Sequence, residues 1–250
     1  MGDPVYRPII LAVRGLFGGL GLKLDVVGEQ NIPRSGGAVL AINHTSYFDF
    51  MLGGIPADRV GHRLVRFMAK DGIFKHPVAG PLMRGMKHIP VDRDAGSAAF
   101  RDAVAAAKAG ELVGVFPEAT MSRSFDIKEI KNGAVRMARA ADVPLIPMIV
   151  FGGQRLLSYD HKDFSRGKTV CLTVGEPLPV PKGVDADELT VELHARLVNL
   201  LDATVARYPD KPAGAWWIPQ RLGGGAPTLD EALAIEDRVR RERAAKRNAN

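Results

Sequence analysis

The chain has 250 residues, enough for one α/β domain with a large buried core. Hydrophobic residues make up 46% and charged residues 25% of the sequence, which excludes an intrinsically disordered chain. The formal net charge of +6 favours anionic partners, meaning membrane surfaces, phosphorylated substrates or nucleic acid. The single cysteine, Cys171, cannot form an internal disulfide, and we expect it to be a small buried hydrophobic residue.

The N-terminal segment, residues 1–22, predicts an amphipathic helix. Its apolar residues recur at helical spacing, and they are Ile9, Val13, Leu16, Phe17 and Leu20. Arg7 and Arg14 leave no stretch near the roughly 18 uncharged residues that a membrane span needs, and Arg14 also splits any signal-peptide core. The helix could pack on the protein's own core or lie in a membrane interface, and we favour the interface.

Residues 23–208 alternate between strand and helix patterns. The expected strands are residues 24–28, 38–43, 66–69, 88–91, 111–116, 144–151 and 168–174. The expected helices are residues 74–86, broken near its two prolines, then 96–109, 131–141 and 185–208. This alternation predicts a single α/β domain with a mostly parallel central sheet flanked by helices.

Residues 209–250 depart from that alternation. A Pro- and Gly-rich connection, residues 209–227, precedes a charged helix expected at residues 228–246. The paired Trp216 and Trp217 in the connection could sit at a membrane interface or pack the tail onto the domain, and we favour packing. The basic residues between 238 and 247 alternate with acidic ones, which is typical of a solvated helix face. Contact with anionic lipid is the second interpretation, and no nucleic-acid motif accompanies the charge.

Two polar segments directly follow apolar runs. The first holds His44 and Asp49 after residues 38–42, and the second is Phe-Pro-Glu-Ala-Thr, residues 116–120, after residues 112–115. The ends of strands are where α/β folds build active sites. A histidine held by a carboxylate can act as a general base for a hydroxyl group.

The spacing of His44 and Asp49 limits how the two side chains can meet. On one continuous helix they would lie about 140° apart, so they meet only if His44 is in a loop and Asp49 in the first helical turn. Ser46 and Asp49 form the pattern of a capping box, which predicts a helix beginning near Tyr47. In the alternative interpretation, Asp49 only caps this helix and His44 is an ordinary loop histidine.

Four ordered blocks within residues 25–180 resemble the glycerophospholipid acyltransferase family, whose best-known members convert lysophosphatidic acid to phosphatidic acid. The first block is Asn43-His44 with Asp49, and the second, residues 85–93, ends in Arg93. The third is residues 116–120 and the fourth is Val-Pro-Leu-Ile-Pro, residues 143–147. Lys131 also falls where the family often has a basic residue.

The resemblance implies roles for these residues. His44 would be the general base, with Asp49 orienting its imidazole, and Asn43 would belong to the substrate-binding set. Arg93 and Lys131 would hold the acceptor phosphate. Glu118 and Thr120 of the third block would position the glycerol part of the acceptor. The donor would be acyl-CoA or acyl-carrier protein, with no other cofactor and no metal.

The chain departs from the family pattern in the third block. Ala119 replaces the usual glycine, which limits a backbone conformation with positive φ. Met121-Ser122 replaces the usual Arg-Ser, and Arg123 follows two positions later. We therefore expect a reshaped acceptor loop in which Arg123 replaces the missing charge. We also expect a backbone N–H near the helix start after His44 to stabilise the oxyanion.

Two other functions remain open at this point. One is an acyltransferase for a different lysolipid or a glycolipid. The other is a non-catalytic membrane-binding protein that uses the N-terminal helix and the basic surface as an anchor. For the enzyme we expect a peripheral or monotopic protein on the cytoplasmic face of the cell membrane. The sequence has no Gly-x-Ser-x-Gly elbow, no His-Glu-x-x-His motif and no cluster of cysteine and histidine. These absences disfavour a serine hydrolase and a metal site.

Overall fold

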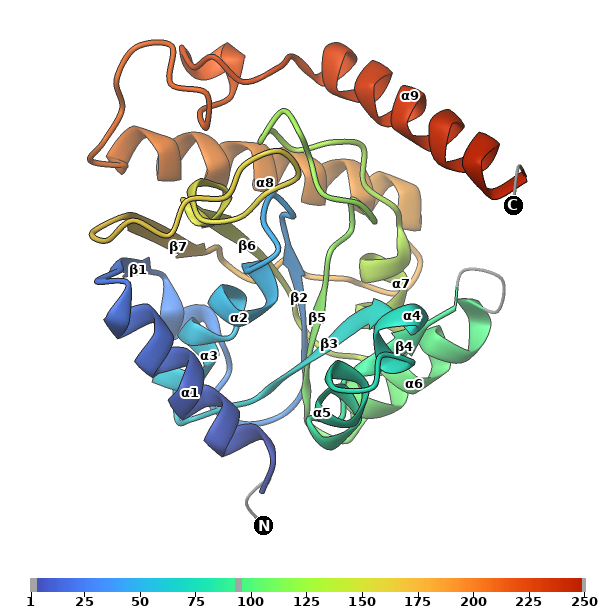
Figure 1. The fold of residues 1–250 in the computed structure, drawn as a ribbon. Coiled ribbons are helices and arrows are strands. Elements are labelled where there is room, and N and C mark those ends of the chain that lie inside the picture. The colour runs from blue at the N-terminus through green and yellow to red at the C-terminus, as the bar shows by residue number, and fades with distance from the viewer. Residues whose placement is uncertain (1–3, 93–95, 249–250) are drawn as a thin grey trace.

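The computed structural model describes residues 4–92 and 96–248 (Figure 1). Its centre is a seven-stranded sheet with the strand order β1-β7-β6-β2-β5-β3-β4. The strands are β1 Lys23–Val27, β2 Ala38–Ile42, β3 Val65–Lys70, β4 Ile89–Val91, β5 Leu112–Val115, β6 Leu145–Phe151 and β7 Thr169–Val174. Neighbouring strands pair in parallel except β6 and β7, which are antiparallel. The predicted single α/β domain with a mostly parallel sheet is confirmed.

Helices flank the sheet on both faces. They are α1 Tyr6–Gly19, α2 Asp49–Gly53, α3 Ile55–Arg59, α4 Asp71–Phe74, α5 Ala79–Gly85, α6 Gly96–Lys108, α7 Gly133–Ala141, α8 Ala186–Arg207 and α9 Leu229–Asn248. Three short 3₁₀ turns lie in the connections between β1 and β2, between β6 and β7, and between α8 and α9: Glu29–Asn31, Gly153–Arg155 and Gln220–Leu222. The break expected near Pro77 is present, since residues 75–78 separate α4 from α5. Pro81 causes no break, because it lies in the first turn of α5, where a proline is tolerated.

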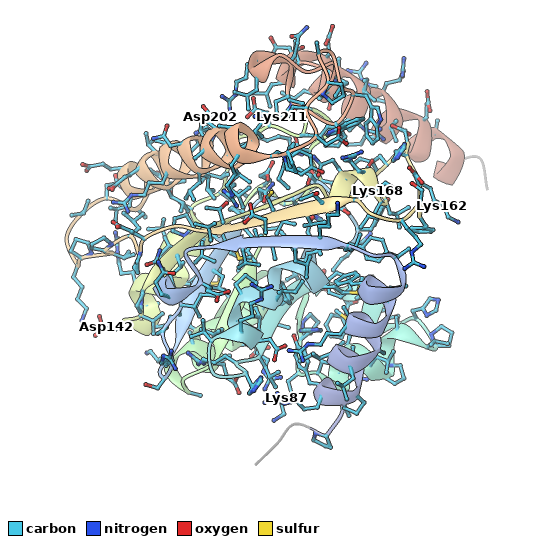
Figure 2. All side chains as sticks on the ribbon, turned by 90° about the vertical axis from the view of Figure 1, so that its left-hand side faces the viewer. Lys87, Asp142, Lys162, Lys168, Asp202 and Lys211 are labelled. Carbon is cyan, nitrogen blue, oxygen red and sulfur yellow. The ribbon has the colours of Figure 1, made fainter. Side chains whose placement is uncertain are left out.

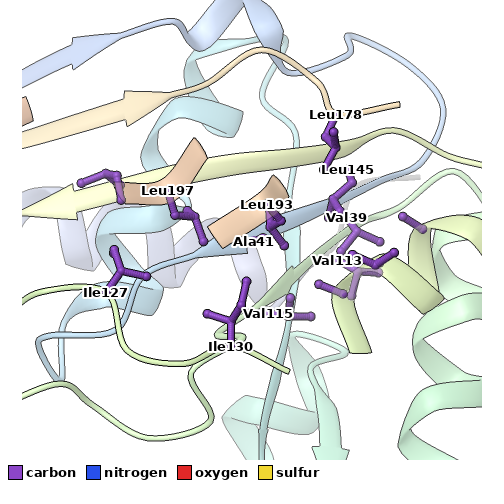
Figure 3. Packing of buried hydrophobic residues seen from close by; sticks show 14 of the residues in the cluster. Val39, Ala41, Val113, Val115, Ile127, Ile130, Leu145, Leu178, Leu193 and Leu197 are labelled. Carbon is purple, nitrogen blue, oxygen red and sulfur yellow. The ribbon is translucent and has the colours of Figure 1, made fainter. Parts of the chain in front are cut away.

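The central strands are buried because both faces of the sheet are covered. Every residue of β2 and of β6 is buried. Successive side chains of a strand point to opposite faces. Val39 and Ala41 therefore belong to a core that includes Leu193 and Leu197 of α8 (Figure 3), whereas Leu40 belongs to the core on the other face.

Helix α1 lies on the face of the sheet opposite to α8, as Figure 2 shows from the β1 edge. Phe17 of α1 is 4% exposed and packs in the core, whereas Leu11 is 65% and Leu16 is 46% exposed. Arg14 forms an ion pair with Asp58 of α3. One side of the helix thus packs on the protein and the other faces outward. None of the helices in the described ranges combines the length and apolarity that crossing a membrane requires.

The C-terminal part folds back over the domain. Residues 209–227 contain little regular structure before α9, and α8 and α9 lie at the end of the molecule reached by the loop after β5 (Figure 1). The Trp216 ring lies 5.8 Å from the Phe125 ring and 4.0 Å from His161. The Trp217 carbonyl accepts a hydrogen bond from Gln154. The tryptophans therefore pack the tail onto the domain, as we favoured, and Arg240 on α9 pairs with Asp237 at the surface.

Candidate active site

The loop after β2 brings His44 and Asp49 together. His44 Nδ1 lies 2.9 Å from Asp49 Oδ2, and α2 begins at Asp49. The same carboxylate oxygen accepts the backbone N–H groups of Thr45 at 2.6 Å and Ser46 at 2.7 Å. Asp49 therefore holds the turn and the imidazole at once. With Nδ1–H donating to the carboxylate, Nε2 keeps the lone pair that a general base needs.

The surroundings of Asp49 keep it away from water. The residue is completely buried, and this burial raises the pKa of the Asp49 carboxyl, while the hydrogen bond from His44 and the two backbone N–H groups lower it. Ser46 differs from a simple cap, because its hydroxyl accepts the N–H of Phe48 and donates to carbonyls of the 153–157 segment. The expected helix start near Tyr47 is therefore two residues early.

Phe116, at the end of β5, holds the other side of the histidine. The two rings are stacked with centroids 4.2 Å apart and planes 21° apart. The His44 side chain is 23% exposed, so the imidazole is clamped on one face and still reachable. Phe116 is the first residue of the third block, but no role was predicted for its ring, because an aromatic residue at a strand end is ordinary core material.

Glu118 binds the backbone of the catalytic loop. Its Oε1 accepts the N–H of His44 at 2.8 Å, and its Oε2 accepts the N–H of Lys128 at 3.1 Å. Burial raises the pKa of the Glu118 carboxyl to about 8, against the effect of both hydrogen bonds. Both carboxyl oxygens of Glu118 accept hydrogen bonds from backbone N–H groups, so Glu118 holds the His44 loop in place.

Asn43 has a similar supporting position. Its amide nitrogen donates to the Val150 carbonyl at 3.2 Å, and its amide oxygen accepts the Val150 N–H at 2.7 Å. The side chain is completely buried. It ties the end of β2 to β6 and so fixes where the His44 loop begins.

The remaining predicted binding residues lie around the third block. Thr120 Oγ1 accepts a hydrogen bond of 2.6 Å from Lys128 Nζ. Arg123 forms an ion pair with Asp160 and lies over the Tyr159 ring, with its side chain 11% exposed. These contacts already occupy the Arg123 guanidinium. The sequence did not predict that Lys128 is buried at this site, although the apolar Ile127 beside it indicates a segment that packs inward.

Lys131 and Arg93 complete the predicted set. Lys131 is exposed, and its backbone N–H donates to the Pro117 carbonyl at 3.0 Å, which places it at the foot of the third block. Arg93 lies outside the described residues. The two residues of the predicted catalytic pair therefore meet, and Phe116 and Glu118 of the third block contact His44. Lys131 lies next to the third block.

Two expectations about the backbone differ from the structure. Ala119 has φ 62°, so the third block keeps the left-handed turn that glycine usually provides. The N–H groups of residues 45–49 each donate to an acceptor within the protein. None of these five donors is thus left for an oxyanion, because four donate to Ser46 or Asp49 in the turn and the Tyr47 N–H donates to the Leu157 carbonyl.

A largely apolar cavity lies beside α1, and its lining includes neither His44 nor Asp49. It has a volume of about 390 Å³, in the usual range for ligand pockets, between α1 and the α2–α3 segment. Ile10 and Val13 of α1 line it together with Phe50 and Met51, which directly follow Asp49. Across residues 4–92 and 96–248, no three His, Cys, Asp or Glu side chains gather as metal ligands would.

Comparison with known proteins agrees with this site. A family model described as Acyltransferase matches residues 23–151, which include the His44 loop and the third block. The chain belongs to the acyltransferase family. The 1-acyl-sn-glycerol-3-phosphate acyltransferase of Bacillus subtilis (strain 168) is 30% identical over 171 residues, covering 68% of this acyltransferase and 77% of that protein.

More distant proteins extend the comparison. The 1-acyl-sn-glycerol-3-phosphate acyltransferase of Borreliella burgdorferi is 26% identical over 189 residues, covering 73% of each chain. The chloroplastic 1-acyl-sn-glycerol-3-phosphate acyltransferase LPAT1 of Arabidopsis thaliana is 26% identical over 212 residues. The matched region makes up only 56% of the length of LPAT1. The crystal structure of PlsC, the 1-acyl-sn-glycerophosphate (LPA) acyltransferase of Thermotoga maritima, has a TM-score of 0.68 at 24% identity. It covers 82% of this chain and 81% of the other, so the two share a fold.

Proposed function

We propose that this acyltransferase moves a fatty acyl group from an acyl thioester to the free hydroxyl of lysophosphatidic acid, giving phosphatidic acid for phospholipid synthesis. The observation that carries the proposal is the His44–Asp49 pair at 2.9 Å in a chain of this family. The names of the bacterial relatives support lysophosphatidic acid as the acceptor. Acyl-CoA or acyl-carrier protein is the co-substrate, and the proposed reaction uses no other cofactor.

The chemistry follows from the orientation of the imidazole. His44 Nε2 takes the proton from the acceptor hydroxyl while the hydroxyl oxygen attacks the thioester carbonyl. Asp49 stabilises the imidazolium that forms, as the aspartate does in a Ser-His-Asp triad, with the substrate hydroxyl in place of serine. When the tetrahedral intermediate collapses, the C–S bond breaks and the imidazolium returns the proton to the thiolate. The products are the ester and the free thiol.

Acceptor recognition is assigned to the basic residues. Arg93 and Lys131 hold the phosphate, because charge-assisted hydrogen bonds to phosphate are strong. Arg123 joins them only if its guanidinium exchanges Asp160, whose side chain is 80% exposed, for the acceptor. Thr120, whose hydroxyl accepts a hydrogen bond of 2.6 Å from Lys128, positions the glycerol part of the acceptor. Asn43 and Glu118 serve this site through the backbone that they hold.

The proposed acceptor lives in a membrane, and α1 offers a surface for it. Its outward positions 8, 11, 12, 15, 16 and 19 are all exposed and uncharged, and Leu11 and Leu16 stand among them. An apolar stripe of this kind suits insertion into the headgroup boundary, and the net charge of +6 suits anionic lipid. We place the enzyme as a peripheral or monotopic protein on the cytoplasmic face of the cell membrane.

The test is an acceptor profile of the purified protein. Release of thiol from a long-chain acyl-CoA is measured with lysophosphatidic acid, other lysophospholipids, a glycolipid or no acceptor. His44→Ala should lower the rate with the preferred acceptor about 10²–10⁴-fold, the usual cost of losing a general base. His194→Ala on α8 is the matched control and should keep the rate.

Each alternative has its own outcome. A preference for another lysolipid or a glycolipid would contradict the proposal that lysophosphatidic acid is the acceptor. It would favour the interpretation that the altered third block binds a different head group. Thiol release with none of the acceptors, by a protein that still binds vesicles, would favour the non-catalytic alternative. Normal turnover by a folded His44→Ala protein would refute the mechanism.

A further inference from the structure

The C-terminal extension, residues 209–248, contacts the loop between β5 and α7, residues 116–132. Arg221 in the extension contacts both carboxylate oxygens of Asp126 in this β5–α7 loop, at 2.6 and 3.0 Å. Its guanidinium also reaches Asp202 of α8 at 2.6 Å. Trp216 packs on Phe125 of the same loop. The extension therefore contacts the loop that carries the third block, although the family model ends at residue 151.

Lys128 is the point where α9 itself reaches that loop. Its ammonium donates to Thr120 Oγ1 at 2.6 Å and to the Met121 carbonyl at 3.2 Å, and lies 3.1 Å from Glu236 Oε1 of α9. The Lys128 side chain is 7% exposed. A buried ammonium needs a countercharge and a full set of acceptors. Glu236 supplies the charge from outside the loop.

From Lys128, two hydrogen bonds lead to the catalytic histidine. The Lys128 N–H donates to Glu118 Oε2 at 3.1 Å, and Glu118 Oε1 accepts the His44 N–H at 2.8 Å. The carbonyl of His44 accepts the Ser122 N–H at 2.7 Å. The β5–α7 loop thus holds the His44 peptide groups on both sides, so the position of the loop sets the position of the imidazole.

The start of α9 is built to place Glu236. Thr228 and Glu231 form a reciprocal capping box, with a bond of 2.8 Å from the Thr228 N–H to Glu231 and one of 3.1 Å from the Glu231 N–H to Thr228. Ala232 is completely buried beneath the first turns. Glu236 follows Ala232 by four residues, so it shares the face of α9 that meets the domain.

We infer that Glu236 and Lys128 are positioning residues, through which α9 fixes the backbone of the catalytic histidine. The inference rests on the proposed role of His44 in acyl transfer. The pair touches no reacting atom and acts through Glu118. Because an error of about 1 Å in a catalytic group costs on the order of 100-fold in rate, a small shift of the β5–α7 loop is enough to be measured.

The kinetic experiment uses full-length variants. Glu236→Ala should lower kcat about tenfold and leave the KM for the acyl thioester within about twofold, because only the orientation of His44 changes. Asp237→Ala, the next residue on α9, removes a surface carboxylate that pairs with Arg240 and should leave both constants unchanged. In a Lys128→Met background, Glu236→Ala should have no further effect, since the two residues act as one unit.

A second readout does not depend on turnover. The imidazole resonances of His44, assigned in the NMR spectrum by comparison with His44→Gln, should move in Glu236→Ala and stay in place in Asp237→Ala. If the wild-type protein transfers no acyl group but this shift occurs, the proposed function fails and the positioning role stands. Equal melting temperatures for the two α9 variants exclude a loss of fold as the cause.

Three results would overturn the inference. The first is a Glu236→Ala protein with wild-type kcat and unmoved His44 resonances. The second is an additive loss in the Lys128→Met background, which would mean that Glu236 acts by another route. The third is a kcat loss of the same size in Asp237→Ala, which would reduce the effect to the general charge of α9. Where Glu236→Ala fails to fold, Glu236→Gln keeps the size of the side chain and the same three results apply.

Discussion

Ala119 occupies a backbone conformation that suits glycine better. Its φ of 62° lies in the left-handed region, which costs an alanine roughly 1–2 kcal/mol. The N–H of Ala119 donates to the Phe116 carbonyl at 3.0 Å, so the turn is closed as a tight turn should be. The residue is exposed, and its side chain makes up little of the core. The third block therefore keeps its turn at a cost in stability.

Ala119→Gly should relieve this cost. We expect the free energy of unfolding to rise by roughly 0.5–1 kcal/mol, less than the strain because glycine also loses more entropy on folding. The same substitution at exposed Ala105 inside α6 should instead lower it by about 1 kcal/mol. Denaturant unfolding of both variants measures the two signs. A loss of stability in Ala119→Gly would contradict the argument.

Glu118 should make stability depend on pH. Burial raises the pKa of its carboxyl from 4.5 to about 8, so the folded state holds the proton more tightly than the unfolded state. The stabilisation is complete below about pH 4.5 and is lost as the pH rises to about 8. We expect the stability difference between wild type and Glu118→Gln to fall by up to about 1.4 kcal/mol per pH unit in that window. A difference that stays flat in denaturant titrations at several pH values would refute it.

The sequence predicted the catalytic pair because His44 and Asp49 are near neighbours in the chain. The spacing and a helix start allowed the imidazole and the carboxylate to meet, and the resemblance to the acyltransferase family made them the catalytic candidates. The supports of that pair were not readable in this way. Glu118 meets His44 across 74 residues and Asn43 meets Val150 across 107, so their partners depend on the strand order. The residues were found, but what they hold was not.

Helix α1 has one side that lines a cavity and another side that faces outward. Ile10 lines the apolar cavity of about 390 Å³, whereas the next residue, Leu11, is 65% exposed. A large side chain at position 10 would therefore fill part of the cavity, whereas the same change at position 11 would alter only the outer surface. We propose that the cavity takes an acyl chain, since its lining reaches Phe50 and Met51 beside Asp49.

Ile10→Trp should shorten the acyl chains that the enzyme accepts. The indole would take up part of the cavity, and each lost methylene contact is worth about 0.8 kcal/mol. We expect kcat/KM to fall for long-chain thioesters and to hold for short ones. Leu11→Trp is the matched control and should leave the chain-length profile unchanged. A chain-length profile that shifts equally in both variants, or in neither, would contradict the proposal that the cavity binds the acyl chain.

The elements that the sequence missed are the shortest ones. Helix α3 has five residues and α4 has four, so neither completes enough turns for a helical pattern to appear. The long helices at 96–108 and 186–207 were predicted to within two residues. The antiparallel direction of β7 was also unreadable, because a strand buried on both faces reads the same in either direction.

Membrane binding of the whole protein should depend on the outward side of α1. Replacing Leu11 and Leu16 by aspartate puts two charges on a surface that would have to enter the headgroup boundary. We expect the double variant to lose most of its sedimentation with anionic vesicles while keeping the same melting temperature, because neither side chain is buried. Val191→Asp is the control, since this residue is 72% exposed on α8, on the opposite face.

The double variant also tests the membrane-interface interpretation of the N-terminal helix against packing on the protein's own core alone. Unchanged sedimentation would mean that the outward side of α1 is an ordinary solvated surface. Loss of binding by the Val191→Asp control as well would mean that negative charge anywhere weakens attachment. Only a loss confined to the α1 variant supports an interface through this helix.

Cys171 has a practical consequence for following such attachment in solution. The residue is the one cysteine of the chain, it is completely buried on β7, and burial raises the pKa of its thiol to about 12. Thiolate is the form that maleimides and iodoacetamides attack, so the native side chain should stay unlabelled in the folded protein. A cysteine introduced at any exposed position therefore becomes the sole handle for a fluorophore or spin label, with no need to alter the natural thiol first.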